Sequence, residues 1–411
     1  MKGQEILDVH KLLESRSAIV KDHNRFLGSD IKSVFTGSAF IDWLINNYNP
    51  THANREELLR LVKEELFNAS LPMQFIYPLE QGGDFLDSDK HFYRFINDQF
   101  KEYKKDPNLL NLYGIDASGL QFFFENTNGE TIFSVSEELQ KATEELYSNF
   151  LDETKTLVDY IRIEESEIFN TGLLPILAKL AFVSITPLLE NANQCKAFFI
   201  NIYNLMNIHA MVVRYRKEKK LDLHVLQRPL FYSQYKYNIG GQIYTLSDIE
   251  QGILRKNSSL AGDVASTVLE FAFNAKPKGE RFTLQDPRRK FVLEYLDPRI
   301  HFALNPGTVS GPEYKYYTAA EIDIQLELSA REYCKRNSYL KEEKEKTFFC
   351  VNEIFKFYKA DFAKEDDALV NYVLSYYGDE DRTNVQAVLE QKQVQLKFVD
   401  YNWTVNKRFD S

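Results

Sequence analysis

The segment from Asp297 to Pro312 holds several side chains that could do chemistry. A histidine can act as a general base, and it can activate a hydroxyl nucleophile when a carboxylate orients its ring. One interpretation is therefore a hydrolase with His301 as the base, Ser310 or Thr308 as the nucleophile, and Glu250 or Asp297 as the orienting carboxylate. The alternative is a histidine buried in the core beside a glycine-rich turn.

Three asparagines recur every third residue in an otherwise apolar stretch. On a helix, Asn201, Asn204 and Asn207 would form one polar stripe. A buried amide without a partner costs roughly 1–3 kcal/mol, so these side chains need hydrogen bonds. The stripe either lines a functional cleft or ties neighbouring segments together.

A thiol nucleophile has weaker support. If Cys195 and His209 share one helix, a rise of about 1.5 Å per residue separates them by roughly 21 Å, too far for a catalytic pair. Cys195 is then expected to be a small buried thiol. The usual dinucleotide, P-loop, zincin and nucleophile-elbow motifs are absent, and we expect neither a cofactor nor a metal.

Composition narrows the class of protein. The 411 residues, 44% hydrophobic and 27% charged, are typical of a folded chain with more than one domain. The net charge of −10 and pI near 5.4 argue against nucleic-acid binding. Three scattered cysteines fit a reduced intracellular compartment. No secretory signal is recognised, and charged or amide residues interrupt both of the most apolar stretches, so we expect no transmembrane segment.

The sequence of the first hundred residues predicts helices followed by short strands. We expect helices at 5–27, 39–46 and 55–68, the last capped by Asn54, and strands at 73–77 and 92–95. The run from Val34 to Leu44, the helix ending at Ala69-Ser70, Phe85-Leu-Asp87 and Phe92 to Phe95 together resemble the DEP domain over residues 15 to 100. That resemblance implies a winged-helix module that recruits signalling proteins to membranes or receptors.

The second unit follows a charged and poorly periodic stretch. Ser134 and Glu137 predict a capping box before a helix that continues to about Leu157. We expect later helices at 173–183, 193–219, 319–336, 351–364 and 365–377. Strands are expected at 237–244, 299–304 and 395–399.

This unit resembles the domain-of-unknown-function family numbered 547. The resemblance rests on five ordered motifs: Ala197 to Asn204, Ile239 to Arg255, Asp297 to Asn305, Phe355 to Phe362 and Asp400 to Asn406. The resemblance implies cysteines at two positions where this chain has Pro306 and Gly311. Neither residue can act as a nucleophile or bind a metal, so any thiol function of the family is expected to be lost here.

We therefore predict an α+β protein: an N-terminal helix at 1–29, a DEP-like winged-helix domain at 30–100, a linker at 101–133 and a mixed α+β domain at 134–411. The predicted function is a non-catalytic intracellular adaptor or scaffold in signalling or in a larger assembly. It binds protein partners through the DEP-like module, and peripheral membrane contact is disfavoured. The alternative is a distant papain-like or transglutaminase-like hydrolase using His301, Ser310, Glu250 and Asn201. The DEP resemblance points to a eukaryote and the cytoplasm, with the cytoskeleton, the cilium and the membrane periphery as narrower alternatives.

Overall fold

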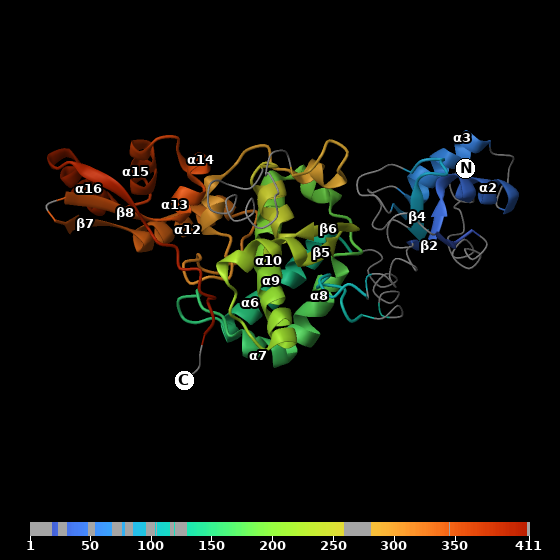
Figure 1. The fold of residues 1–411 in the computed structure, drawn as a ribbon, viewed down its shortest axis with the longest axis horizontal. Coiled ribbons are helices and arrows are strands. Elements are labelled where there is room, and N and C mark those ends of the chain that lie inside the picture. Colours follow the sequence, from blue (N-terminus) through green and yellow to red (C-terminus); the bar gives the residue numbers. More distant parts are fainter. Residues whose placement is uncertain are drawn as a thin grey trace.

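The computed structural model describes residues 19–23, 31–47, 54–67, 76–78, 85–95, 103, 105–115, 119, 130–258, 281–344 and 346–408. Helices and strands alternate along these ranges, so the class is mixed α and β, as predicted. Figure 1 shows an N-terminal unit, a central helical body and a C-terminal unit in a row. In the described part of the chain, no helix has the length and apolar character needed to cross a bilayer.

The N-terminal unit packs two helices on a small antiparallel sheet. The strands β1 (Lys21–His23), β2 (Ile31–Thr36), β3 (Ile76–Pro78) and β4 (Phe92–Phe95) lie in the order β1-β2-β4-β3. Helix α2 spans Gly37–Asn47, and α3 spans Arg55–Leu61 and continues as the π-helical turn η2 (Val62–Leu66). Asn54 caps α3 by accepting a hydrogen bond from the Glu57 amide at 2.9 Å, as predicted.

An aromatic core holds this unit together. Phe35, Trp43 and Leu44, from the run that resembles the DEP domain, are all buried. Phe85 and Tyr93 complete the cluster, with ring centroids 4.5 Å apart. Gly37 is required because a Cβ there would lie 1.8 Å from the Leu86 carbonyl oxygen.

Residues 103–115, in the predicted linker, are built into the neighbouring body. The Leu110 amide donates to the Lys236 carbonyl at 2.9 Å, and the Lys236 amide donates to Asn108 at 3.0 Å. Leu109 and Leu112 are buried in one cluster with the N-terminal core and with Phe182 of the central body. This segment therefore joins the two units by packing, although the predicted division of the chain at 101–133 stays a prediction.

The central body surrounds one long buried helix, α9 (Ala192–Glu218). Its apolar residues are buried around the whole helix, so it runs through the core and not along its surface. The elements around it are α6 (Ile132–Phe150), α7 (Tyr160–Glu165), η3 (Ile168–Leu173), α8 (Leu174–Lys179), η4 (Thr186–Glu190), η5 (Val225–Gln227), α10 (Arg228–Gln234), the hairpin β5 (Lys236–Ile239) and β6 (Gln242–Thr245), η6 (Asp248–Leu254), η7 (Pro287–Phe291) and η8 (Pro298–Phe302).

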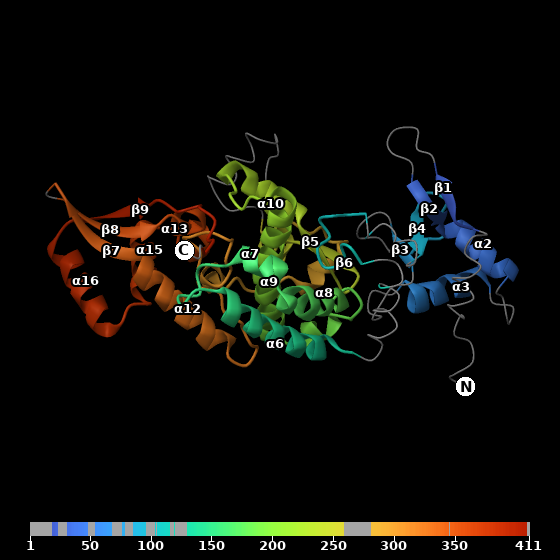
Figure 2. The ribbon, with the colours of Figure 1, turned by 90° about the horizontal axis from the view of Figure 1, so that it is seen from below.

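The C-terminal unit is a three-stranded sheet with helices against it (Figure 2). Helix α12 (Ile322–Asn337) leads into the hairpin β7 (Ser338–Glu343) and β8 (Lys346–Asn352). The chain then passes through α13 (Ile354–Phe357), α14 (Lys359–Phe362), α15 (Asp366–Leu374) and α16 (Asp379–Gln391). Strand β9 (Val394–Val399) returns parallel to β8, which gives the order β7-β8-β9.

After β9 the chain runs back across the central body. Residues 402–408, which we call the return segment, bond to two distant places. The Val309 amide donates to the Thr404 carbonyl at 2.9 Å, and the Val158 amide donates to the Asn406 carbonyl at 2.8 Å. The return segment thus links α7, the turn after η8 and the C-terminal sheet.

Several predicted elements need correction. The strand expected at 299–304 is wrong: Asp297 caps a 3₁₀ turn there, because its carboxylate accepts from the Arg299 amide at 3.1 Å and Pro298 begins the turn. The capping box of α6 is formed by Thr131 and Ser134, and α6 ends at Phe150 instead of near Leu157. The helix expected at 5–27 is wrong at β1, and its other residues, except 19 and 20, lie outside the described ranges.

The start of the predicted helix 351–364 is also wrong, since β8 continues to Asn352. The predicted helices at 193–219 and 319–336 and the strand at 395–399 are confirmed as α9, α12 and β9.

Candidate functional site

His301 lies in η8 and is held by a carboxylate that is distant in the sequence. Its Nε2 is 2.8 Å from Oδ2 of Asp361 in α14. The ring stacks on Tyr358 with centroids 3.9 Å apart, and Phe362 contacts it edge-on. The His301 side chain is only 2% exposed, so the imidazole is enclosed by protein.

Arg255 binds the same carboxylate from the other side. Its Nε and Nη2 donate to the two oxygens of Asp361 at 2.7 and 2.9 Å, a bidentate contact. The guanidinium also lies over the Tyr358 ring, 4.9 Å from its centroid, and donates to the Gln251 side chain. Arg255 follows η6, so the contact fastens this turn to α14.

Glu250 joins the cluster through Tyr358. Its carboxylate accepts hydrogen bonds from the hydroxyls of Tyr358 at 2.7 Å and Tyr203 at 3.2 Å. It also accepts one from Nε2 of the Gln251 side chain at 2.8 Å. We call this set the His301 cluster: His301, Asp361, Arg255, Tyr358, Glu250 and Gln251. Glu250 and His301 thus contact the same tyrosine, but the carboxylate that holds the imidazole is Asp361.

The cluster fixes the protonation of its members. Burial lowers the pKa of His301, and this outweighs the contact with Asp361. Burial alone would raise the pKa of Asp361, but the bonds from His301 and Arg255 bring it down to about 2. At neutral pH, Asp361 is therefore ionised, and His301 is neutral and donates its Nε2 proton to it.

The predicted nucleophiles are occupied elsewhere. The Ser310 hydroxyl accepts from the Asn402 amide at 2.9 Å, and the Thr308 hydroxyl bonds to the Tyr401 hydroxyl at 2.7 Å. The carboxylate of Asp297, the other predicted orienting group, is bound by Lys196 at 3.0 Å and by Arg299 at 2.8 Å. None of these contacts joins the predicted groups to His301.

The asparagine stripe ties segments together at two of its three positions. Asn201 donates to the Tyr317 carbonyl at 2.8 Å and accepts from the Tyr317 amide at 2.9 Å. Asn204 donates to the Ala303 carbonyl and accepts from the Asn305 amide, both at 2.9 Å. Asn207 is fully buried, and neither of its amide atoms has a partner. Asn201 is therefore placed as a clamp on the backbone at Tyr317, away from the His301 cluster.

The cysteines are separate, buried thiols. Cys195, Cys334 and Cys350 are all free. Burial raises the pKa of Cys195 to about 12, and its thiol donates weakly to the Phe291 carbonyl at 3.7 Å. His209 lies on the same helix, as predicted, and its Nδ1 is 3.0 Å from the Tyr237 hydroxyl.

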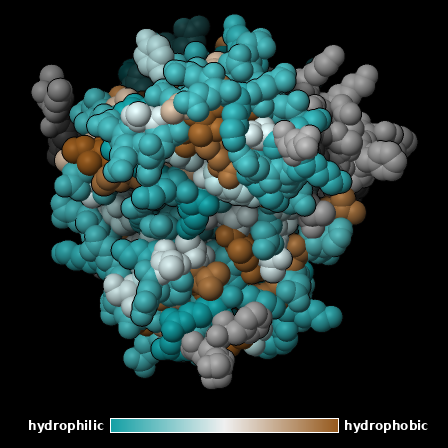
Figure 3. Space-filling view, turned by 90° about the vertical axis from the view of Figure 1, so that its left-hand side faces the viewer, coloured by the Kyte–Doolittle hydropathy of each residue, from teal (hydrophilic) through white to brown (hydrophobic). Residues whose placement is uncertain are grey.

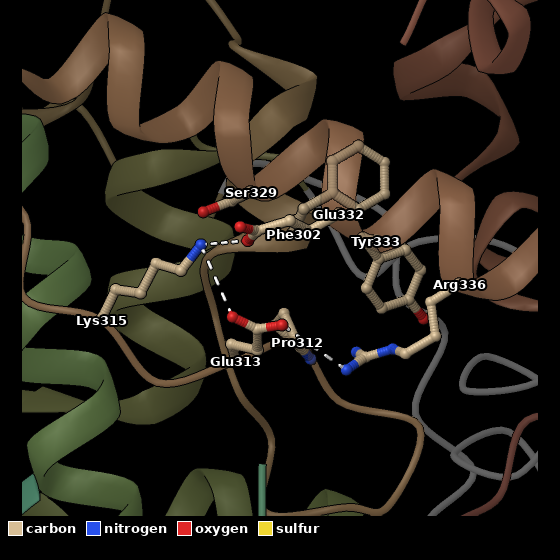
Figure 4. Close-up of a pocket in the computed structure, with 8 residues that line it drawn as sticks. All are labelled: Phe302, Pro312, Glu313, Lys315, Ser329, Glu332, Tyr333 and Arg336. Carbon is tan, nitrogen blue, oxygen red and sulfur yellow. Dashed lines mark hydrogen bonds and ion pairs between the residues drawn. The ribbon is translucent and has the colours of Figure 1, made fainter. Parts of the chain in front are cut away.

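A small pocket, open to solvent, lies beside α12 (Figure 4). Its lining comprises Phe302, Pro312, Glu313, Lys315, Ser329, Glu332, Tyr333 and Arg336. Lys315 pairs with Glu332 and lies 3.7 Å from Glu313, and Arg336 lies 3.9 Å from Glu313. The charges at this pocket are thus already paired. Within the described ranges, no group of three or more metal-binding side chains is found.

Sequence reasoning missed Asp361, Arg255 and Tyr358. Arg255 and Asp361 each stand within an apolar motif, and a charged side chain in such a place requires a partner once it is buried. That signal identifies both residues as candidates for pairing. It does not show that they pair with each other, because 106 residues separate them.

The comparison with protein families gives a match in the middle of the chain. Residues 188–334 match a family described as "Protein of unknown function, DUF547". The matched range includes α9, the β5–β6 hairpin, His301 and most of α12, while Tyr358 and Asp361 lie beyond it. This match does not extend to the resemblance to a DEP domain, which stays a prediction, and no curated protein or solved structure matches the chain. The second of the two resemblances is therefore supported over residues 188–334, where the chain matches the DUF547 model, and over the rest of residues 134–411 it stays a prediction.

Proposed function

We propose that this protein is a non-catalytic adaptor or scaffold. The observation that carries the proposal is the enclosure of His301, whose Nε2 contacts Asp361 while its ring lies against Tyr358. A general base must reach the proton that it removes. Here the proposed nucleophiles Ser310 and Thr308 bond to Asn402 and Tyr401 instead.

The interactions of the His301 cluster support a structural role. It connects η6, η8 and α14, which are far apart in the sequence, through charge-assisted hydrogen bonds. Its donors and acceptors are directed at one another and not at the charge-paired pocket beside α12. We therefore propose that the cluster shapes a binding domain.

A direct test compares the full chain with the His301→Gln variant. Both proteins are incubated with a fluorophosphonate probe and with a set of ester and amide substrates. We expect the two to show the same background rates and no covalent labelling. Faster turnover or Ser310 labelling in the wild type alone would favour the hydrolase alternative, in which the Asp361–His301 pair supplies the base.

We further propose that the N-terminal unit is a DEP-like module that binds a protein partner. Two helices on a short antiparallel sheet around Phe35, Trp43 and Tyr93 support this proposal. Residues 30–96 contain six basic and ten acidic side chains, a net charge of −4, which disfavours anionic membranes. Lys90 is exposed but Arg94 is buried, so these two residues do not form a surface patch together.

Vesicle sedimentation distinguishes the two kinds of partner. The full chain is mixed with phosphatidylserine-rich vesicles at low and at physiological salt. We expect no binding at physiological salt and no difference between the wild type and Lys90→Ala. Strong binding that weakens with salt and is lost in Lys90→Ala would replace the protein partner with a membrane.

A photo-crosslinking residue tests the protein partner itself. It is introduced at Leu86, which is 39% exposed in the N-terminal unit, and, as a matched control, at Leu328, which is 50% exposed on α12. In an extract of the source cells, we expect a discrete crosslinked product from position 86 and none from position 328. Equal products from both positions would argue against a partner site on the N-terminal unit.

A further inference from the structure

The two edges of the C-terminal sheet differ in chemistry. Edge strand β7 carries three consecutive charged residues, Lys341 to Glu343, which discourage pairing with another strand. The opposite edge strand, β9, has the sequence VQLKFV, with one charge and neither proline nor glycine. Figure 2 shows β9 at the outer margin of the sheet. An unprotected edge of this composition is a template for a further strand.

The backbone direction of β9 follows from one hydrogen bond. Glu353 directly follows β8, and its amide donates to the Val399 carbonyl at 2.9 Å, so the Val399 carbonyl points toward β8. Successive residues of a strand alternate in the direction of their amide and carbonyl groups. The same groups of Val394, Leu396 and Phe398 therefore point away from the sheet and are available to another strand.

The side chains of β9 divide cleanly between the two faces. Val394, Leu396 and Phe398 pack against the C-terminal core. Gln395 and Lys397 lie on the other face, where Lys397 contacts Glu343 at 2.8 Å and lies over the Phe348 ring. Gln395 is exposed.

These directions make β9 complementary to itself. We infer that β9 pairs antiparallel with β9 of a second copy of this chain, about a two-fold axis at Leu396. Leu396 then faces its own copy in a hydrogen-bonded pair, and Val394 faces Phe398 on the apolar face. On the polar face, Lys397 faces Gln395 and not another lysine. No side chains of like charge face each other. The two three-stranded sheets become one six-stranded sheet.

The surface at this end of the molecule suits an interface dominated by main-chain pairing. Figure 3 shows that this end is mostly hydrophilic, with apolar residues in small separate patches. Pairing through one strand buries little area, so the dimer is expected to be weak and concentration-dependent. The inference does not rest on the proposed adaptor function.

The test is sedimentation equilibrium of the full chain from about 1 μM to about 1 mM, the range expected for a small interface. Gln395→Lys opposes lysine to lysine twice per dimer, whereas Gln395→Glu opposes glutamate to lysine twice. We expect the dissociation constant to rise about three- to tenfold in Gln395→Lys and to fall by a similar factor in Gln395→Glu. The matched controls are Gln391→Lys and Gln391→Glu, at the exposed end of α16. These substitutions should leave the dissociation constant of the dimer unchanged.

Opposite shifts at position 395, with none at 391, support the two-fold pairing. A wild-type chain that stays monomeric over the whole range overturns it. So does a dimer whose dissociation constant is the same in both Gln395 variants, because its interface must then lie elsewhere. Circular dichroism of each variant at 1 μM, about the bottom of the range, checks that the exposed substitutions leave the fold intact.

Discussion

Asp361 lies between His301 and Arg255 and accepts hydrogen bonds from both, at 2.8 Å and at 2.7 and 2.9 Å. The three side chains come from α14, η8 and the end of η6. One buried carboxylate therefore holds three elements in place: the Arg255 guanidinium compensates its charge, and the neutral His301 imidazole donates a hydrogen bond to it.

Removing that charge should be costly. In Asp361→Asn, the Arg255 guanidinium stays buried without an anion, and we expect a loss of about 3–5 kcal/mol in the free energy of unfolding. Urea denaturation at pH 7 measures this loss. The matched control is Asp366→Asn, which breaks the more exposed pair with Lys359 and should cost about 1 kcal/mol or less. Equal losses in the free energy of unfolding in the two variants would show that the buried contact of Asp361 stabilises the protein no more than the exposed pair does.

Two buried histidines should make stability depend on pH. Burial lowers the pKa of His209 to about 3, and burial also lowers that of His301. Both are neutral when folded but gain a proton on unfolding below the ordinary value of about 6.5. Stability is therefore fully present above pH 6.5 and falls below it, by about 1.4 kcal/mol per pH unit for His209 until its folded pKa of about 3 is approached, and in the same direction for His301.

Urea unfolding at several pH values between 7 and about 4 tests this dependence. Replacing His209 with Gln should reduce the slope of the unfolding free energy against pH by about one proton, and replacing His301 with Gln should reduce it in the same direction just below pH 6.5. A slope that neither substitution changes would mean that other groups control the loss of stability in acid.

The thiols should be unreactive in the folded protein. Burial raises the pKa of Cys195, Cys334 and Cys350, so little thiolate forms at pH 8. Iodoacetamide labelling followed by mass spectrometry should modify all three rapidly in urea and slowly in native buffer. Rapid native labelling of any one, faster than the urea control, would revive a cysteine hydrolase.

Limited proteolysis should separate the two predicted units between residues 100 and 133. Chymotrypsin has candidate sites in that stretch at Leu109 to Leu112 and at Phe122 to Phe124. Leu109 and Leu112 are buried, and the neighbouring backbone bonds to β5, so we expect protection there and first cleavage elsewhere between residues 100 and 133. Initial cleavage at Leu109 to Leu112, or only inside either unit, contradicts this domain division.

Local signals in the sequence predicted much of the secondary structure but little of the site. The apolar run of α9 is long enough to predict a helix directly, and Asn54 marks a helix start. Ile300, Phe302 and Leu304 alternate as in a strand. Asp297 instead caps a 3₁₀ helix that begins at Pro298, so these residues form a turn. The β7–β8 hairpin was missed because charged residues form the end of β7, from Lys341 to Glu343, and begin β8 at Lys346.

The site was predicted less well because its contacts are between distant residues. His301 and Glu250 were recognised as candidates, and both belong to one cluster. Their partners Asp361 and Tyr358 come from a helical segment after β8, and no spacing rule relates it to η8 or η6. Ser310 was placed with His301 because it is close in sequence, but the return segment holds its hydroxyl.

The return segment also determines when the central body can finish folding during translation. Val158 donates to Asn406 and accepts from the Arg408 amide at 2.9 Å, and Thr156 accepts from the Asn406 side chain, 250 residues later in the chain. While the nascent chain elongates, the backbone at α7 has no partner on this side until residue 408 has left the ribosome. The central body can therefore collapse early but cannot complete these hydrogen bonds before that point.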